Sequence, residues 1–470
     1  MQRLQLQKFF CAVGALAALG LGTAHADTPL QKASVFPFHD GDRVVFLGDS
    51  ITEQKLYTTY LETYLLTRFP TWSLSFRNAG WGGDTSYLRQ RGLPPPQALQ
   101  RDVIALKPTV VTIDFSMNDA SYGSFQQDKY DLHIAGQNQI VQQLKAAGIR
   151  PIMLTSSAVE KNEQGDDLVG YNQTLEQFAA GDAAVAAKAG IPFADQFHPF
   201  VDAINRLRSI NPSLRLSGDA VHPGNAGHLM MADSILTGLN APAMVSSATL
   251  SARHGSVVST VGAYITNVVA MKNGGLSFQR RDRALVFPIE PAARPILQLV
   301  PVADDLDRYM LQIIDLAPGE YTVSVNGVTI SRFSAAQLAG GVNLSYYDSP
   351  LSAPGMEILK HVYNKNNLYF NRWRNVQLAN PAPADQQVQL TSLDRQIADE
   401  ERQINSFRHP AIFQFLVAPL IDKVCHLLWL MSPSFLQAFE LGPVKVILQY
   451  RPVLWMRAFF DDDPCSFSRR

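Results

Sequence analysis

Residues 43–50 read RVVFLGDS, an apolar run typical of a buried strand that passes directly into glycine, aspartate and serine. The following stretch, 53–69, stops before Pro70 and has apolar residues at helical spacing, namely Leu56, Tyr60, Leu61, Tyr64 and Leu65. A buried strand, a short polar turn and an amphipathic helix form the first repeat of an α/β fold. The turn at Ser50 is therefore a position from which a rigid sheet presents a side chain.

The same alternation of strand and helix continues to about residue 239. Short apolar runs occur at 74–77, 110–115, 150–155 and 191–194, with helical segments such as 137–147 and 172–189 between them. This pattern predicts a parallel sheet covered on both faces, a three-layer α/β domain over residues 40–242. Because ligands bind at the carboxyl ends of the strands in such sheets, we expect functional residues directly after the strands.

Polar blocks follow these strands or precede the last helix of the domain. They are Gly48-Asp49-Ser50, Gly82-Gly83-Asp84-Thr85-Ser86, Asn118-Asp119 and Asp219-Ala220-Val221-His222-Pro223. Each block alone has an ordinary structural explanation, such as a helix cap at Asp49 or a loop tied down by Asp219. Metal ligation by the last block is disfavoured, because no third ligand follows at suitable spacing.

Taken together, the blocks supply what a serine nucleophile requires. Ser50 needs a base, for which His222 is suited, and a carboxylate three residues earlier is suited to orient that imidazole. A glycine N–H of the second block and the Asn118 amide are suited to donate to a developing oxyanion. Because the sheet would bring these loops to one edge, the blocks predict nucleophilic acyl transfer.

The blocks resemble those of the SGNH or GDSL hydrolase family over about residues 40–240. The matching stretches are GDSITE at 48–53, NAGWGGDTS at 78–86, MND at 117–119 and DAVHP at 219–223. The resemblance implies a flavodoxin-like sheet, hydrolysis of carboxylic esters, and no metal or organic cofactor. It also implies residue roles: Ser50 attacks, His222 acts as base and then acid, Asp219 orients His222, and the oxyanion is bound by the N–H groups of Ser50 and Gly83 and by the Asn118 amide.

One position departs from the family pattern. The third block usually begins with glycine, and this chain has Ser116 there. We expect serine to be tolerated at this position if its backbone is not left-handed.

The composition changes after about residue 245. Asn326-Gly327 separates two alternating runs and is a strong hairpin signal, which predicts a small β-rich domain over residues 245–378. An amphipathic helix is expected at 384–409, its apolar stripe packed on the protein itself or on a coiled-coil partner. Residues 411–470 form an apolar tail, with a fusion, a frame-shifted end and a membrane-surface element as open interpretations. The stretches 317–344 and 365–378 are similar to the C-terminal part of some bacterial family members, a similarity that implies no role.

The N-terminal residues 1–26 predict a signal peptide. Arg3 and Lys8 precede an apolar run, and Ala24-His25-Ala26 has the small-x-small form of a cleavage site. A membrane anchor is disfavoured because the run is shorter than the ~20 residues that span a bilayer. We therefore expect a periplasmic or secreted protein, a compartment that permits a disulfide between Cys425 and Cys465 without showing that they meet.

These observations combine into one leading hypothesis with two alternatives. The leading hypothesis is an esterase that removes short acyl groups, acetyl above all, from carbohydrate esters through an acyl-enzyme. One alternative is a lysophospholipase, lipase or thioesterase, which the apolar tail would suit; the other is a non-catalytic carbohydrate-binding protein, for which Ser116 is the only motive. The expected partner is a small-molecule or polysaccharide ester, with membrane contact through the tail as an option. The formal net charge of -1, without any Lys or Arg run, argues against nucleic acid.

Overall fold

The computed structural model describes residues 35–87, 93–160, 169–211 and 215–420. The predicted signal peptide and most of the predicted tail, with Cys425 and Cys465, lie outside the described residues.

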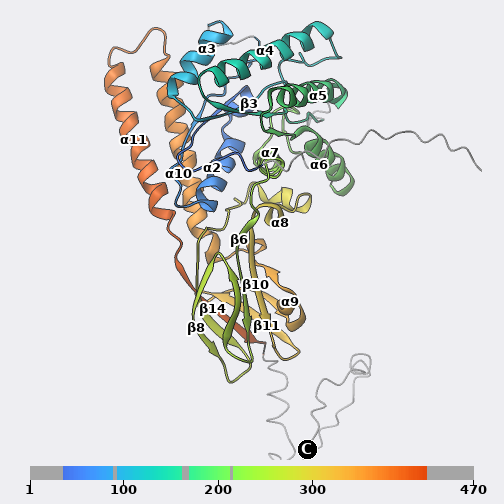
Figure 1. Cartoon of the computed structure of the whole chain (residues 1–470), viewed down its shortest axis with the longest axis vertical. Helices are drawn as coiled ribbons and strands as arrows, with labels where there is room; N and C mark the ends of the chain where they lie inside the picture. The colour runs from blue at the N-terminus through green and yellow to red at the C-terminus, as the bar shows by residue number, and fades with distance from the viewer. Residues whose placement is uncertain (1–34, 88–92, 161–168, 212–214, 421–470) are drawn as a thin grey trace, which may run out of the picture. The chain divides into compact units, whose positions relative to one another are not determined.

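A parallel five-stranded sheet forms the centre of the N-terminal part (Figure 1). Its order is β2-β1-β3-β4-β5, made of β1 (Arg43–Gly48), β2 (Ser75–Asn78), β3 (Val110–Asp114), β4 (Arg150–Leu154) and β5 (Phe193–Ala194). In the register, Val44 is paired with Phe76 on one side and with Val110 on the other. This is the doubly wound order of flavodoxin-like folds, so the predicted α/β architecture is confirmed.

Helices cover both faces of this sheet, as the run RVVFL requires. Val44 and Phe46 pack with α2 and α7, whereas Val45 and Leu47 pack with α3 and α4. Successive residues of a strand point to opposite faces, so a strand buried on both sides has no polar positions. The short helix α1 (Ser50–Glu53) follows β1. Figure 1 shows the other helices of this part around the sheet: α2 (Leu56–Arg68), α3 (Pro95–Asp102), α4 (Gln127–Ala146), α5 (Asn172–Ala189), α6 (Phe197–Ile210) and α7 (Asn225–Gly238).

Two further sheets share a second core after residue 243. Their orders are β13-β10-β6-β7 and β12-β11-β14-β9-β8. The predicted hairpin joins β11 to β12, and φ is +49° at Asn326 and +81° at Gly327, as a type I′ turn needs. The strands are β6 (Met244–Ser251), β7 (Ser256–Val261), β8 (Ala263–Ala270), β9 (Leu276–Asp282), β10 (Arg308–Ile314), β11 (Glu320–Val325), β12 (Val328–Ser334) and β13 (Val342–Asn343), with short helices α8 (Val302–Leu306) and α9 (Ala335–Gly340).

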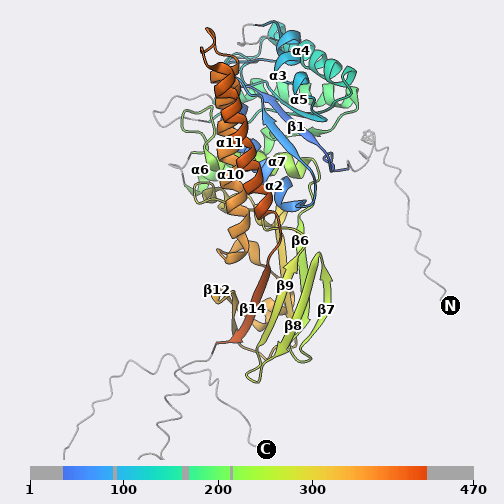
Figure 2. The same cartoon turned by 90° about the vertical axis from the view of Figure 1, so that its left-hand side faces the viewer.

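The tail predicted to begin at residue 411 differs from the structure at its start. Strand β14 (Ile412–Pro419) lies between β11 and β9 and is antiparallel to both (Figure 2). Its alternate residues Phe413, Phe415 and Val417 are buried in the core shared by the two sheets. The residues of β14 are mostly apolar, which conceals this period of two. The predicted tail therefore includes β14, which belongs to the second core.

A helical hairpin precedes β14 and occupies part of the range predicted as β-rich. It consists of α10 (Ala353–Phe370), the π-helical turn η6 (Asn371–Gln377) and α11 (Gln386–Phe407), and its two long helices run side by side in both views (Figures 1 and 2). The Lys365 ammonium on α10 donates to Glu62 on α2, and both side chains are buried. The hairpin therefore packs on the α/β part of the chain, and the apolar stripe of α11 is buried against this chain at Leu393, Ile397 and Ile404.

Candidate active site

Ser50 is the first residue of α1, two residues after β1 ends at Gly48. Asp49 caps this helix, because its Oδ1 accepts the N–H of Ile51 at 2.9 Å. Gly48 is packed so closely that an added Cβ would lie 2.1 Å from Thr52 Oγ1 and 2.6 Å from Asp114 O. The tight turn from strand to helix therefore requires glycine, and it presents Ser50 at the carboxyl edge of the sheet.

Ser50, His222 and Asp219 form one chain of hydrogen bonds. The Ser50 hydroxyl donates to Nε2 of His222 at 2.8 Å, and Nδ1 of the same imidazole donates to Asp219 Oδ2 at 2.7 Å. The other carboxylate oxygen of Asp219 accepts the N–H groups of Val221 and His222. With the proton on Nδ1, the free lone pair of Nε2 is directed at the serine, the geometry of a nucleophile and its base.

The electrostatics of Asp219 suit this arrangement. Partial burial raises the pKa of Asp219, but hydrogen bonds from the His222 backbone and imidazole and from the Val221 N–H outweigh it, so that the pKa lies below its usual value. The carboxylate is therefore ionised at neutral pH and stabilises a positive charge on the imidazole. The His222 side chain is 33% exposed, which leaves the dyad open to a substrate.

The glycine loop lies beside the serine. A Cβ built on Gly82 would be 3.8 Å from Ser50 Cβ, and Gly83 has a φ of +76° that favours glycine. The N–H of Gly82 donates to Glu53 Oε2, so this N–H is not available to an oxyanion. Gly83 remains the predicted donor from this loop.

Asn118 is hydrogen-bonded to the same loop. Its Nδ2 donates to Asp84 O at 3.0 Å, and its Oδ1 accepts the Tyr122 hydroxyl at 2.8 Å. An amide nitrogen carries two N–H groups, so the bond to Asp84 uses one and the other is the predicted oxyanion donor. The structure thus brings the predicted site residues together at one edge: Ser50, Gly83, Asn118, Asp219 and His222.

Residues 46–230 match the GDSL-like Lipase/Acylhydrolase family, a range that includes every one of these positions. Residues 46–230 therefore form a domain of this family. The protein is accordingly a carboxylic ester hydrolase, and the resemblance noted in the sequence is confirmed.

This GDSL-like hydrolase is similar to an esterase and to a drug-metabolizing enzyme. An acetylxylan esterase from Geobacillus stearothermophilus is 27% identical over 218 residues, which cover 42% of this chain and 93% of that protein. A solved structure of a catalytic mutant of that esterase is 26% identical and covers 43% of this chain and 95% of its own, with a TM-score of 0.36. A solved gut microbial diltiazem-metabolizing enzyme is 22% identical with a TM-score of 0.71, covering 82% of this chain and 99% of its own, so the shared fold extends beyond the hydrolase domain.

Ser116 of the GDSL-like hydrolase does have a left-handed backbone, with a φ of +93°. The condition under which serine was expected to be tolerated is therefore not met, and the conformation is strained by about 1–2 kcal/mol. Two hydrogen bonds hold it: the Ser116 N–H donates to Asp119 Oδ2 at 3.2 Å, and its hydroxyl donates to Asp182 Oδ2 at 2.8 Å. Side-chain anchoring here takes the place of the conformational freedom of glycine.

A buried charged network lies behind Asn118, and no sequence motif marked it. His133 is clamped between two carboxylates, 2.7 Å from Asp119 Oδ1 and 2.8 Å from Asp182 Oδ1, with all three side chains fully buried. Burial lowers the pKa of His133, but the two carboxylates outweigh it and raise the pKa to about 10. Because Asp119 also accepts the N–H of Ser86 at 2.8 Å, this imidazolium ties the Asn118 loop to the glycine loop.

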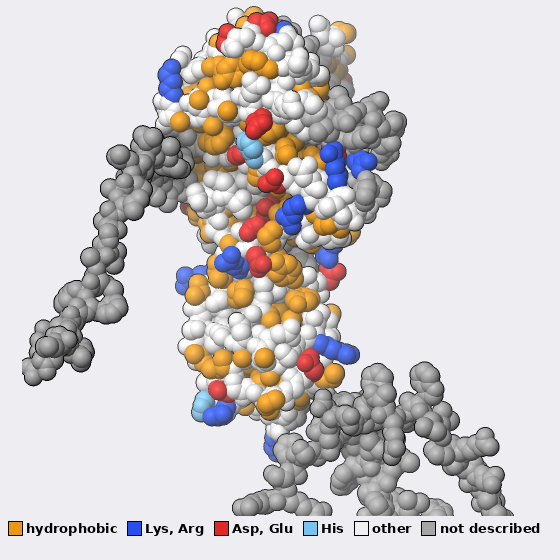
Figure 3. Space-filling view, turned by 90° about the vertical axis from the view of Figure 1, so that its right-hand side faces the viewer, with side chains coloured by type: hydrophobic (Ala, Val, Ile, Leu, Met, Phe, Trp, Pro, Cys, Tyr) orange, Lys and Arg blue, Asp and Glu red, His pale blue; other side chains and the backbone are white. Residues whose placement is uncertain are grey.

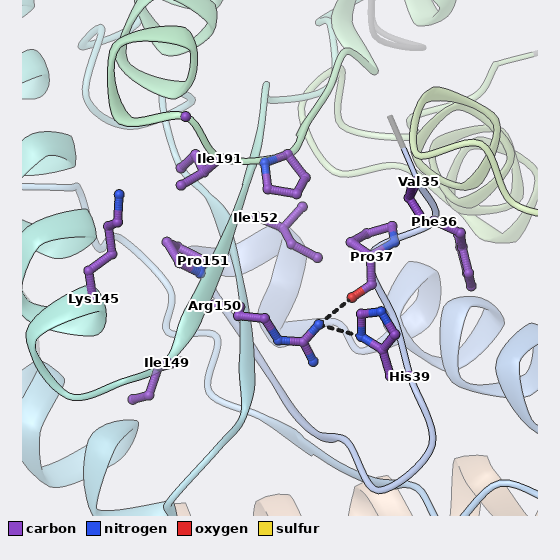
Figure 4. A pocket seen from close by; sticks show the side chains of 12 residues that line it. Val35, Phe36, Pro37, His39, Lys145, Ile149, Arg150, Pro151, Ile152 and Ile191 are labelled. Atoms are coloured by element: carbon purple, nitrogen blue, oxygen red, sulfur yellow. Dashed lines mark hydrogen bonds between the residues drawn. The ribbon is translucent and has the colours of Figure 1, made fainter. Parts of the chain in front are cut away.

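An apolar cavity of about 470 Å³ lies elsewhere on the GDSL-like hydrolase (Figure 4). Its lining residues lie before β1 and β5, and before and at the start of β4. They are Val35, Phe36, Pro37, His39, Lys145, Ile149, Arg150, Pro151, Ile152, Gly190, Ile191 and Pro192. The guanidinium of Arg150 donates within this group to Pro37 O and His39 Nδ1. Since the strands are parallel, this cavity lies at the edge of the sheet opposite Ser50, and none of its residues belongs to the candidate site.

Among the described residues, no group of three or more His, Cys, Asp or Glu side chains is placed to hold a metal ion. None of the helices in the described part of the chain has both the length and the apolar character needed to cross a membrane.

Proposed function

We propose that the protein is a serine esterase with Ser50 as nucleophile, and that it removes short acyl groups, acetyl above all, from carbohydrate esters. The observation that carries the proposal is the hydrogen bond of 2.8 Å from Ser50 Oγ to His222 Nε2, with Asp219 on the other imidazole nitrogen. Nucleophile, base and orienting carboxylate are thus already in mutual contact.

The reaction follows from these contacts. His222 Nε2 takes the hydroxyl proton as Ser50 Oγ attacks the ester carbonyl carbon, and Asp219 stabilises the imidazolium that forms. The negative oxygen of the tetrahedral intermediate accepts hydrogen bonds from the N–H groups of Ser50 and Gly83 and from Asn118 Nδ2. The imidazolium then gives its proton to the leaving alkoxide, and water, deprotonated by the same imidazole, hydrolyses the acyl-enzyme to acid and free serine.

The proposed substrate rests on two observations. The relative from Geobacillus stearothermophilus bears the name acetylxylan esterase, which favours acetyl esters of carbohydrate. The apolar cavity of about 470 Å³ lies at the opposite edge of the sheet from Ser50, so it does not receive an acyl chain bound at the nucleophile (Figure 4). This cavity therefore gives no support to the lipase alternative.

The proposed setting is outside the cytoplasm, with a polysaccharide or smaller ester as partner. It rests on the signal-peptide pattern of residues 1–26. On the face drawn in Figure 3, Lys and Arg side chains are separated by acidic and uncharged ones rather than joined in a basic area. That distribution suits a neutral ligand better than a nucleic acid.

The test compares hydrolysis of p-nitrophenyl esters from acetate to palmitate by the wild type, Ser50→Ala and the matched control Ser73→Ala, which replaces an exposed serine. We expect the highest rate on acetate, loss of that rate in Ser50→Ala alone, and release of acetate from acetylated xylan. A Ser50-dependent rate that rises with chain length would move the protein to the lipase alternative. Turnover that survives Ser50→Ala would refute the assigned nucleophile.

A further inference from the structure

The C-terminal helical hairpin reaches the glycine loop beside Ser50. The contact is made by η6, the turn that follows α10, and 294 positions separate Arg374 on that turn from Gly80 in the loop. No step of the proposed reaction uses this segment, although it contributes a charged side chain next to an oxyanion donor.

The Arg374 guanidinium contacts Glu53, Gly80 and Trp81. Its Nη2 lies 3.3 Å from Glu53 Oε1, and its Nη1 donates to Gly80 O at 3.5 Å. Its Cζ lies 3.3 Å from the centre of the Trp81 ring, a stacked cation–π arrangement. Only 17% of the Arg374 side chain is exposed, so the guanidinium is held between the loop and its own helix.

Glu53 transmits this contact to the loop. One of its carboxylate oxygens meets Arg374, and the other accepts the N–H of Gly82. Glu53 is also the last residue of α1, the helix that Ser50 begins. A guanidinium on one oxygen therefore fixes the orientation of the carboxylate that holds the Trp81–Gly82 peptide.

Apolar packing by the same turn also fixes this loop. The Trp81 ring meets Trp373 edge-on, with centroids 5.6 Å apart, and Trp373 is buried with Tyr369 and Ile397. The Trp81 N–H donates to Gly48 O at 3.0 Å, which ties the loop to the end of β1. The two residues before Gly83 are thus held by both the hairpin and the sheet.

We propose that Arg374 is a positioning residue for the oxyanion hole. Through Glu53 and Trp81, it fixes the peptide that joins Trp81 to Gly82, one peptide before the Gly83 N–H, so that this N–H points to the carbonyl oxygen being attacked. This inference rests on the proposed function, and it gives the C-terminal hairpin a part in the same reaction. Positioning matters here because a displacement of about 1 Å at a reacting group costs on the order of 10²-fold in rate.

The first test is the kinetics of Arg374→Ala on p-nitrophenyl acetate and butyrate. We expect kcat to fall about 10- to 100-fold with KM nearly unchanged, because oxyanion contacts strengthen in the transition state. The loss is expected to be equal for both esters, since the proposed role concerns the carbonyl oxygen that both esters share. Arg372→Ala is the matched control: Arg372 lies two residues away and bonds Asp394 on α11, so kcat is expected to stay at the wild-type value.

Further variants separate positioning from folding. Arg374→Lys keeps a charge for Glu53 but loses the stacked planar group, so we expect an intermediate kcat. Glu53→Gln combined with Arg374→Ala is expected to lose no more than the larger single loss, because the two residues act on one peptide. Hydrogen exchange of the Gly82 amide, measured by mass spectrometry of the whole protein, is expected to be faster in Arg374→Ala than in Arg372→Ala.

The outcomes are distinct. An active wild type whose kcat is unchanged in Arg374→Ala would overturn this inference and leave the proposed function standing. A loss confined to KM would assign Arg374 to substrate binding and also overturn it. A wild type without Ser50-dependent hydrolysis would overturn the proposed function, and the inference with it.

Discussion

Ser116 stands where the family usually has glycine, and hydrogen bonds hold its left-handed backbone in place. Its φ of +93° is strained, and its hydroxyl is held by Asp182. Ser116→Gly removes the strain together with the hydrogen bond, two effects of about 1–2 kcal/mol and opposite sign. Ser116→Ala keeps the strain and loses the bond, so we expect Ser116→Ala to be the less stable variant by about 1–2 kcal/mol. Urea denaturation of both proteins measures the difference, and equal midpoints would contradict it.

Asn118 and Ser50 are expected to differ in how much activity their loss removes. Asn118→Ala removes one of several oxyanion donors, which costs roughly 10²–10³ in turnover. Ser50→Ala removes the nucleophile and is expected to leave almost no activity. Single-turnover kinetics on p-nitrophenyl acetate distinguishes the two, and full activity in both variants would refute the site assignment.

Residues near one another in sequence were the ones that could be predicted. Ser50, Gly83, Asn118 and the Asp219–His222 pair each lie in a short block whose chemistry is visible without a structure. The spacing Asp-x-x-His alone is not sufficient, since Asp195 and His198 repeat it and are hydrogen-bonded at 2.6 Å. The order of the four blocks along the chain made the difference.

Residues that act through distant partners could not be predicted in this way. His133 lies on a helix, and its role depends on Asp119 and Asp182, each from a different segment. Arg374 stands in a stretch whose family similarity was noted without a role. In both cases the function arises from tertiary contacts that no local spacing records.

At the scale of elements, α10 is held on α2 by a buried ion pair between Lys365 and Glu62. Removing one partner leaves the other charge buried, so we expect Lys365→Ala to destabilise the protein by about 3–5 kcal/mol. The apolar pair Lys365→Met with Glu62→Leu is expected to recover most of that loss. Chemical denaturation measures both, and a double variant no more stable than Lys365→Ala would contradict the explanation.

The buried ion pairs of His133 with Asp119 and Asp182 are expected to make the stability of the protein depend on pH. The pKa of His133 is raised to about 10 in the folded chain, against about 6.5 when unfolded. A raised pKa gives stability that is complete below about pH 6.5 and is lost as the pH rises toward 10. Burial raises the pKa of Asp119, but His133 and Ser86 outweigh it and lower the pKa overall, so its contribution is lost in acid instead.

The measurement is the difference in Tm between the wild type and His133→Gln, which places a neutral amide where the charged imidazole was. We expect the difference to be largest near pH 6 and to shrink steadily toward pH 10. A difference that is constant over this range would show that the imidazole is neutral in the folded protein.

At the scale of the whole molecule, β14 decides where the chain can be shortened. A chain that ends at Pro410 lacks the strand between β11 and β9. We therefore expect the two sheets after residue 243 to lose their cooperative unfolding transition. The matched control ends at Leu420 and keeps every strand of the described sheets. Calorimetry and limited proteolysis of the two chains test this, and equal stability would contradict the role given to β14.

The overall architecture was only partly predictable for a related reason. The α/β part alternates strand and helix in chain order, so composition and period are enough to describe it. In the second part, β14 follows the helical hairpin in sequence but pairs with β9, and α10 packs on α2 of the first part. Domain boundaries drawn along the sequence cannot predict such segments, because neighbouring stretches of the chain pack into different cores.

The place of β14 also has a consequence for biosynthesis. Strands β9 and β11 are made well before residue 412, yet each must keep one edge unpaired until β14 arrives between them. Unpaired edges are the surfaces through which nascent chains associate wrongly. The central sheet at 43–194 carries no such delay, because its strands are complete before β6 begins. The hydrolase part thus has the chance to fold while the chain is still growing, and the second part waits for the arrival of its last strand.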